Sequence, residues 1–259
     1  MGDLTVVKLG GSLLEDRKLR KRALDAIAAR VSAGESLVVV HGGGKRIDSF
    51  LADLKIPKRT HQGLRVTDGK TLDVVVAVLA GLVNKELVSE LRAEGISAAG
   101  FSGVDGDTLW AEFHPRLGNV DLGYVGAVVE SNPALVKAVL AIGLLPVVAS
   151  VAVGRDGTLL NVNADAAAAA LATALGAKRL VFLTDVEGLL DEEGHLVPEA
   201  TVERARELLG STAVTGGMKP KLRACVDAVT GGVSQVLIAG PDRHDSALSS
   251  GKGGTLLAA

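Results

Sequence analysis

Two short apolar runs near the start of the sequence each end in glycines. Residues 4–9 lead into Gly10-Gly11, and residues 37–40 lead into His41 and the three glycines 42–44. Without Cβ atoms, such turns let the backbone approach a phosphate group and point several N–H groups at its oxygens. Each turn taken alone is equally consistent with a plain tight turn, so a nucleotide site needs support from other residues.

Three charged residues stand at places where they could take part in chemistry, and for Lys8, within an apolar run, the charge is costly unless it meets a partner or a ligand. Lys8 lies within the apolar run 4–9, Asp165 opens an alanine-rich segment, and Lys221 follows a glycine-rich loop. Buried charges of this kind are typical of functional sites. The structural alternatives are a strand-end lysine lying along its apolar neighbours, a carboxylate that only caps a helix, and an ordinary surface lysine.

Several other kinds of site are excluded by spacing. Neither the G-x-x-x-x-G-K-[ST] loop nor the G-x-G-x-x-G fingerprint occurs in the chain. The five histidines show no spacing typical of zinc ligands, so we expect no metal held by the protein alone. Ser12 and Ser102 lack the flanking glycines of a hydrolase nucleophile turn.

The spacing of apolar residues predicts the elements that position these groups. Short β-branched runs alternate with stretches of helical period, which indicates an α/β fold with an open, mainly parallel sheet. In such a sheet, ligands bind beyond the carboxyl ends of the strands, where the glycine turns lie. The predicted strands are residues 4–9, 37–40, 96–101, 144–150, 180–183 and 235–239. The predicted helices are residues 16–31, 67–95, 166–175, 202–209 and 221–230, with one more after Asn132-Pro133.

The pattern changes between residues 103 and 129. Short alternating segments with glycines predict hairpins here, which we expect to form a flap over the sheet. The sequence shows no repeat and no linker. We expect two lobes on one continuous sheet, residues 1–150 and 151–259, with a soft boundary near 151–154.

Composition limits the classes of partner. The 28 Lys and Arg against 30 Asp and Glu give a net charge of −2 without a basic run, which argues against nucleic acid. The single Cys225 cannot form an internal disulfide, and no secretion signal is evident, so we expect a cytoplasmic protein. Because every apolar stretch is shorter than the roughly 20 residues of a bilayer helix, we expect no membrane partner.

Eight segments taken together resemble the amino-acid kinase family, and within it the branch that acts on N-acetylated glutamate. The resemblance covers nearly the whole chain, and its force comes from the order of the segments, because each one alone is weakly specific. The segments are residues 7–12 (VKLGGS), 40–44 (VHGGG), 63–68 (GLRVTD), 81–85 (GLVNK), 122–126 (LGYVG), 161–165 (NVNAD), 183–186 (LTDV) and 216–218 (GGM).

The resemblance implies a three-layer αβα sandwich and an enzyme that transfers a phosphoryl group from ATP to a carboxylate. The product would be the acyl phosphate of N-acetyl-L-glutamate, in arginine biosynthesis. Lys8 and Lys221 would flank the transferred phosphoryl group, and Asp165 would hold both lysines. The implied substrate-binding residues are Gly43, Gly44, Arg65, Asn161 and Asn163. The implied ATP-binding residues are Gly10, Gly11, Thr184, Asp185, Gly216, Gly217 and Met218, with Mg²⁺ held mainly by the nucleotide.

Some alternatives stay open. The family usually carries an apolar residue where this chain has Lys219, so Lys219 competes with Lys221 as the second catalytic lysine. The acidic substrate could instead be N-succinylglutamate, free glutamate or aminoadipate on a carrier protein, and a catalytically inactive sensor of amino acids or nucleotides is a rival of another class. Because the first strand begins so early, without the extra helix of arginine-inhibited hexameric relatives, we expect a homodimer insensitive to arginine.

Overall fold

The computed structural model describes residues 3–116, 118–211 and 214–258. Its centre is an eight-stranded sheet in which six neighbouring strands run parallel. In spatial order these six are β13 (Gln235–Ala239), β11 (Arg179–Leu183), β1 (Thr5–Leu9), β2 (Leu37–His41), β8 (Leu145–Ala149) and β5 (Ala98–Ser102). Beyond β13, β14 (Thr255–Ala258) pairs antiparallel, and β12 (Glu199–Thr201) pairs parallel with β14.

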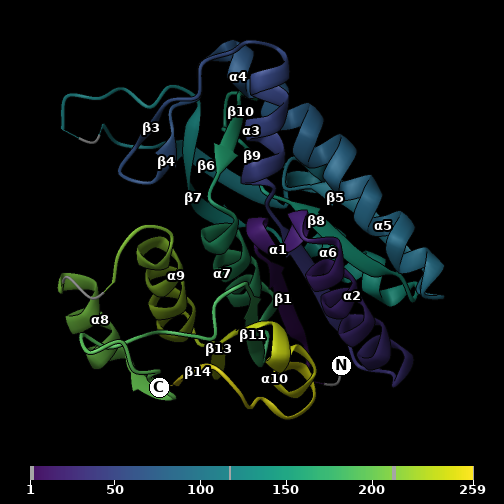
Figure 1. The fold of residues 1–259 in the computed structure, drawn as a ribbon. Helices are drawn as coiled ribbons and strands as arrows, with labels where there is room; N and C mark the ends of the chain where they lie inside the picture. Colours follow the sequence, from purple (N-terminus) through teal and green to yellow (C-terminus); the bar gives the residue numbers. More distant parts are fainter. Residues whose placement is uncertain (1–2, 117, 212–213, 259) are drawn as a thin grey trace.

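Helices cover both faces of this sheet, which confirms the α/β sandwich (Figure 1). Alternate residues of β1 belong to different cores, because successive side chains of a strand point to opposite faces. Val6 packs with one set of helices and Val7 with the other. The first set is α6 (Ala134–Ala141), α7 (Ala164–Leu175), α8 (Val202–Gly210) and α9 (Met218–Thr230). The second is α1 (Gly11–Glu15), α2 (Arg17–Ser32), α3 (Gly44–Asp53), α4 (Gly69–Val76), α5 (Asn84–Ala93) and α10 (His244–Ser250).

The long helix predicted over residues 67–95 is present, but it is not uniform. Asp68 accepts a hydrogen bond from the Thr71 N–H and so caps α4, which satisfies one of the N–H groups left without a partner at the start of a helix. Between α4 and α5 the chain adopts a π-helix, η1 (Ala77–Val83), with wider turns than an α-helix. Apolar periodicity does not distinguish the two helix types, so a helix was predicted here but its π-helical form was not.

The segment predicted to form hairpins belongs to a four-stranded closed barrel. β6 (Leu109–Phe113) and β7 (Val125–Ser131) form the expected antiparallel pair, and β9 (Val151–Val153) and β10 (Leu159–Val162) close it. The short strands β3 (Thr60–His61) and β4 (Leu64–Arg65) form a separate hairpin. The barrel therefore unites strands from residues 1–150 with strands from 151–259.

The prediction that residues 235–239 form the last strand is wrong, because α10 and β14 follow it. Two short 3₁₀ segments, η2 (Asp105–Asp107) and η3 (Pro241–Arg243), complete the described elements. None of the helices in the described part of the chain has the length and apolar character needed to cross a bilayer.

Candidate active site

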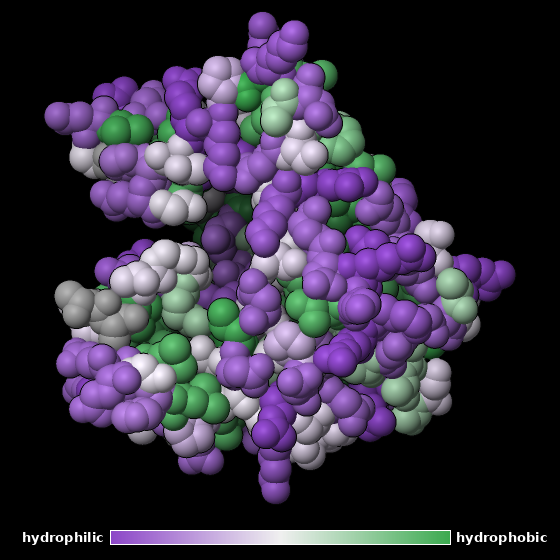
Figure 2. Space-filling model, in the orientation of Figure 1, coloured by the Kyte–Doolittle hydropathy of each residue, from purple (hydrophilic) through white to green (hydrophobic). Residues whose placement is uncertain are grey.

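A cleft opens on one side of the molecule, between the β3–β4 hairpin with the barrel above and α8 with α9 below (Figure 2). The ribbon shows α7 between these two parts (Figure 1). The glycine turns after β1 and β2, and the chain after β11, all leave the carboxyl edge of the sheet, where an open α/β sheet binds its ligands.

Lys8 reaches this region from the middle of the sheet. It precedes the last residue of β1, a strand that is buried along its whole length, and its side chain is 8% exposed. Its Nζ lies 2.6 Å from Oδ1 of Asp165. The sequence places a charge among apolar residues here, and the structure supplies the partner that such a charge requires.

Asp165 is positioned by the start of α7. The helix is capped by Asn163, whose Oδ1 accepts hydrogen bonds from the N–H groups of Asp165 and Ala166 at 2.9 and 3.1 Å. Asn163, rather than Asp165, is therefore the capping residue. Asp165 is the second residue of α7, in the first turn, where the helix dipole favours a carboxylate. Because Asn163 caps the helix, the carboxylate of Asp165 is left to bind cations.

Lys221 joins the same carboxylate from the first turn of α9. Its Nζ lies 3.2 and 3.4 Å from the two carboxylate oxygens of Asp165, and also 5.2 Å from the centre of the Phe182 ring. Lys219, two residues earlier, is exposed and makes no ion pair within the described ranges. Of the two competing lysines, it is thus Lys221 that meets Asp165.

The three side chains form one buried, charged group with an excess of one positive charge. Burial lowers the pKa of Lys8 and the charge of Lys221 lowers it further, although Asp165 opposes both effects. Burial alone would raise the pKa of Asp165, but the two lysines outweigh it and hold that pKa below its usual range. Two cations that share one anion leave an unbalanced charge, so the group favours an anionic ligand.

The two glycine turns meet beside this group. The Gly10 N–H donates to the Leu183 carbonyl at 3.0 Å, and a Cβ on Gly11 would lie 3.4 Å from the Gly44 nitrogen. α3 begins at the second turn, and its N-cap, Gly43, provides no side-chain cap. The first N–H groups of α3 therefore remain available to an anion, as in other phosphate sites at helix N-termini.

Asp185 lies just after β11, on the side of the Gly10-Gly11 turn. Its carboxylate accepts hydrogen bonds from the hydroxyls of Ser12 and Thr184, the second at 3.1 Å. Partial burial raises the pKa of Asp185, but these hydrogen bonds and the charge of Lys45 bring it below the usual range. Sequence reasoning rejected Ser12 as a nucleophile and missed this contact, because Ser12 and Asp185 are distant in the chain.

Arg65 approaches the second glycine turn from β4. Its Nη2 donates to the Gly44 carbonyl at 3.0 Å and forms an ion pair with Asp48 of α3. Its Nη1 is buried and has no partner among the described atoms. A guanidinium held on one side and unsatisfied on the other is suited to bind a carboxylate. Asp48 was not predicted, since nothing in its local sequence distinguishes it from a surface acid.

The remaining predicted residues lie around the same cleft. Asn161, in β10, donates from Nδ2 to the Thr67 hydroxyl at 3.1 Å, and the amide nitrogen of Asn163 is not used by its cap. Thr184 is buried after β11. Gly216 and Gly217 are exposed before α9, whose N-cap, Gly217, has no side-chain cap. The Met218 N–H donates to the Thr215 carbonyl at 3.1 Å.

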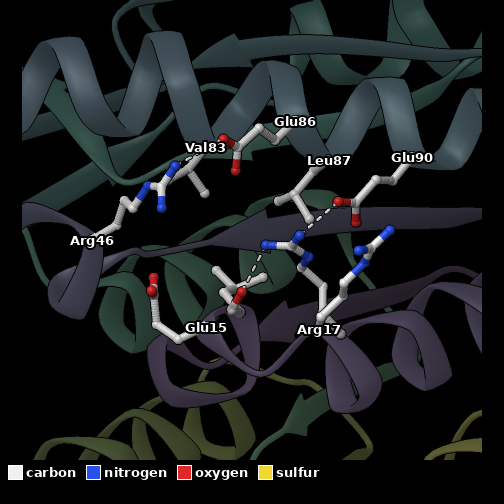
Figure 3. Close-up of a pocket in the computed structure, with 9 residues that line it drawn as sticks. Glu15, Arg17, Arg46, Val83, Glu86, Leu87 and Glu90 are labelled. Atoms are coloured by element: carbon white, nitrogen blue, oxygen red, sulfur yellow. Dashed lines mark hydrogen bonds and ion pairs between the residues drawn. The ribbon is translucent and has the colours of Figure 1, made fainter.

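A separate cavity of about 460 Å³ is lined by side chains of α1, α2, α3 and α5 (Figure 3). Ion pairs join α5 to its neighbours around the cavity, from Glu86 to Arg46 of α3 and from Glu90 to Arg20 of α2. It contains none of the predicted site residues. Within the described chain, the one group of acidic and histidine side chains close enough to share a metal ion is Asp191, Glu193 and His195, at a turn away from Lys8.

Comparison with known proteins places this arrangement in a family. The chain is 46% identical to an acetylglutamate kinase of Solibacter usitatus, over 90% of each chain. It is 43% identical to the acetylglutamate kinase of Caldanaerobacter subterraneus subsp. tengcongensis, over 92% of this chain and 80% of that protein. The solved structure of smu.665 from Streptococcus mutans UA159 superposes with a TM-score of 0.84 at 32% identity, over 100% of this chain and 99% of that one. The model of the amino acid kinase family matches residues 3–240, and the chain belongs to that family.

Proposed function

We propose that the protein transfers the γ-phosphoryl group of ATP to the γ-carboxylate of N-acetyl-L-glutamate. The product is an acyl phosphate, and the reaction belongs to arginine biosynthesis. The observation that carries the proposal is the buried group formed by Lys8, Asp165 and Lys221, at the edge of the sheet where two glycine turns meet. The acetylglutamate kinases that match most of the chain give the substrate.

The chemistry requires what this site contains. A carboxylate with a pKa of about 4.3 is already ionised at neutral pH, so the nucleophile needs no general base. The remaining problem is to bring two anions together in line and to neutralise charge on the phosphoryl oxygens. The ammonium groups of Lys8 and Lys221 would flank the phosphoryl group on its way from one oxygen to the other. Asp165 would keep the two ammonium groups at a fixed separation without cancelling their combined charge.

In this proposal the two reactants enter from different parts of the chain. Residues 1–150 contribute most of the acyl-amino-acid site, and residues 151–259 contribute most of the ATP site. The free Nη1 of Arg65 would pair with the α-carboxylate of the substrate, and Asn161 and Asn163 would bind its remaining polar groups. The ATP side would consist of Gly10, Gly11, Thr184, Asp185, Gly216, Gly217 and Met218, and the N–H groups of Gly11, Gly43 and Gly44 would bind phosphate oxygens.

Mg²⁺ is part of the proposal, with the phosphates of ATP and water as its main ligands. The exposed carboxylate of Asp185 offers a hard oxygen ligand of the kind Mg²⁺ takes, beside the turn at Gly10. When bound, Mg²⁺ neutralises charge on the β- and γ-phosphates. The charge of Asp185 also opposes, together with Asp165, the lowering of the Lys8 pKa by burial.

The experiment that tests the function is trapping of the acyl phosphate with hydroxylamine. Purified protein is incubated with ATP, Mg²⁺ and one acid at a time, namely N-acetylglutamate, N-succinylglutamate, free glutamate or carrier-linked aminoadipate. Hydroxamate formed fastest with N-acetylglutamate supports the proposal, and a clear preference for another acid moves the substrate assignment to it. Absence of hydroxamate with all four acids, together with intact ATP binding, would assign the chain to the sensor class.

The working form in this proposal is a cytoplasmic homodimer. Cys225 is a buried free thiol, which suits a reducing compartment, and the dimer rests on the family resemblance. Light scattering of the purified protein distinguishes a dimer from a monomer or hexamer. Addition of L-arginine to the activity assay tests the expected insensitivity to this amino acid.

A further inference from the structure

The segment GLVNK at residues 81–85 resembles its family counterpart, but the proposed chemistry gives it no role. It ends the π-helix η1 and begins α5, and Asn84 within it is completely buried. Both the oxygen and the nitrogen of a buried amide need hydrogen-bond partners, so the partners of Asn84 indicate its role. π-helical turns also occur frequently at functional sites.

The contacts of Asn84 fix the orientation of its amide. Its Nδ2 donates to the carbonyls of Val147 and Phe101 at 2.9 and 3.2 Å, and its Oδ1 accepts from Nζ of Lys85 at 2.9 Å. Two carbonyl oxygens can only face the NH₂ group, and an ammonium group can only face the oxygen. Gly100 leaves the space for this amide, because a Cβ there would lie 2.1 Å from Oδ1.

The same NH₂ group determines the protonation of His41. Nε2 of His41 also lies 3.0 Å from Nδ2 of Asn84, so the two hydrogens of this NH₂ group face three acceptors and one hydrogen is shared between two of them. Because an amide NH₂ group donates and does not accept, Nε2 has to be an acceptor. In a neutral imidazole the proton is then on Nδ1, which lies 3.0 Å from the Gly42 carbonyl oxygen. His41 therefore donates to Gly42, and the chain of contacts runs from Asn84 through the imidazole to the glycine turn.

The hydrogen bond to Gly42 orients the next peptide N–H. A trans peptide is planar, and its C=O and N–H point in opposite directions. When the Gly42 carbonyl points inward to His41, the N–H of Gly43 points outward. Within the described chain this N–H has no partner, while the Gly43 carbonyl is held by the Ile47 N–H at 2.9 Å. A Cβ on Gly43 would lie 2.8 Å from the Leu79 side chain of η1, so a side chain there would have to displace that leucine.

We infer that His41 and Asn84 are positioning residues that hold the peptide between Gly42 and Gly43 with its N–H directed at the transferred phosphoryl group. The inference rests on the proposed function for the identity of that group. It assigns a role to two segments of the chain, the π-helix that delivers Asn84 and the histidine before the glycines. Neither residue touches the reactants.

The environment of His41 keeps it in the form that this role needs. Burial lowers the pKa of His41, the hydrogen bond to Gly42 opposes this effect and the charge of Lys85 adds to it, so that the pKa falls to about 4. The imidazole is therefore neutral at physiological pH, with one donor and one acceptor. A protonated ring would present a second N–H to the NH₂ group of Asn84, and two donors would then face each other.

Two amide substitutions of His41 test separately the ring nitrogen that donates, Nδ1, and the ring nitrogen that accepts, Nε2. In His41→Asn the side-chain amide can occupy the place of Nδ1 and still donate to Gly42, whereas His41→Gln extends to the place of Nε2 and leaves Gly42 without its donor. We expect His41→Gln to lower kcat by about tenfold, part of the 10²–10³ loss that follows outright removal of an oxyanion donor. The KM for N-acetylglutamate should stay within about twofold, and His41→Asn should keep more than half of kcat.

Thermal unfolding of both variants serves as the control for folding. Equal loss of kcat in both variants, or loss that follows Tm rather than the position of the donor, would overturn the inference. A second measurement needs no activity and no variant, namely a long-range ¹H–¹⁵N NMR spectrum of the wild-type imidazoles. We expect the Nδ1–H tautomer for His41 down to about pH 5, given its pKa of about 4, and an Nε2–H tautomer would overturn the inference. Failure of the proposed function can be told apart from failure of this inference. In that case the wild-type protein would phosphorylate none of the acids, while His41 would still show the expected tautomer.

Discussion

Lys8 and Lys221 share a single carboxylate, that of Asp165, although one lysine comes from the first strand and the other from α9. Without Asp165, each lysine would be a buried charge with no anionic partner in this group. Together with Asp165 they form a buried group with a net positive charge, at the edge where an open α/β sheet binds its ligands. This relationship makes the role of each residue separately testable.

Lys8→Ala should lower kcat by on the order of 10² or more, since the role proposed for Lys8 is to stabilise charge mainly in the transition state. The KM for N-acetylglutamate should change much less. The measurement is steady-state kinetics with hydroxylamine trapping. Lys219→Ala is the matched control, because Lys219 is exposed beside the same glycine loop and should leave kcat near the wild-type value. A Lys8→Ala enzyme with normal kcat would exclude the assigned role.

Asp165→Asn should destabilise the fold, because it leaves two buried ammonium groups without an anion. Breaking a buried ion pair from one side typically costs about 3–5 kcal/mol. The free energy of unfolding from urea titrations measures this loss, and addition of ATP should restore part of it by supplying negative charge. Asp25→Asn, which removes an exposed helix pair with Lys21, should have little effect. Equal stability of the two variants would contradict the electrostatic account.

Stability should fall as the pH is lowered from about 6.5 to 4, because unfolded His41 takes up a proton and folded His41 does not. With a pKa of 6.5 in the unfolded state and about 4 in the folded state, His41 contributes roughly 3 kcal/mol at pH 7 that is lost over this range. Burial also lowers the pKa of His244, so this residue too makes the folded state less stable as the pH falls. Urea titrations of wild type and His41→Asn at pH 7 and pH 4.5 isolate the contribution of His41, and equal pH dependence of the two proteins would refute it.

Arg65→Ala should mainly weaken binding of the acidic substrate. Its free Nη1 is expected to bind the α-carboxylate, and a hydrogen bond to a charged group contributes about 1.5–3 kcal/mol, equivalent to an increase in KM of about 10- to 100-fold. The KM for ATP should stay close to that of wild type. Arg59→Ala, at an exposed arginine near the same hairpin, is the control. An unchanged KM for N-acetylglutamate would remove Arg65 from the substrate site.

Gly100→Ala should displace Asn84, since the new methyl group would lie 2.1 Å from its Oδ1. Forcing a methyl group into a packed site typically costs about 1–3 kcal/mol. We also expect kcat to fall, because the contact between Asn84 and His41 depends on this packing. Gly69→Ala places a methyl group at the start of α4, where nothing lies within 4 Å, and should be close to neutral. Comparison of Tm and kcat for these two alanine variants checks the prediction.

Those parts of the site that depend on local pattern were predictable from the sequence. The run before Gly10 is apolar apart from Thr5 and Lys8, which predicts both a buried strand and an exceptional charge within it. A helix cap at Thr67 or Asp68 and the turns rich in glycine follow from the conformational preferences of single residues, and the structure shows that Asp68 is the cap. The α/β class follows in the same way from the alternation of short β-branched runs and helical periods.

Contacts between residues distant in the chain were not predictable by these means. The hydrogen bond from Ser12 to Asp185 and the ion pair between Arg65 and Asp48 join ordinary polar residues that only the fold brings together. The π-helix before Asn84 has the same apolar pattern as an α-helix, so its wider turns leave no local signal. β14 is short and pairs antiparallel in a mainly parallel sheet, so the alternation of strands and helices does not indicate it.

The position of β14 also constrains the order in which the molecule assembles. β14 lies between β13 and β12, so β12 has no strand to join until residues 255–258 have been synthesised. α8 follows β12 directly and packs against α9, the helix that carries Lys221. During translation this edge of the protein therefore completes after the glycine turns and the barrel. Nascent chains arrested on the ribosome before β14 should be cut by protease near β12, while β1 and β2 are already protected.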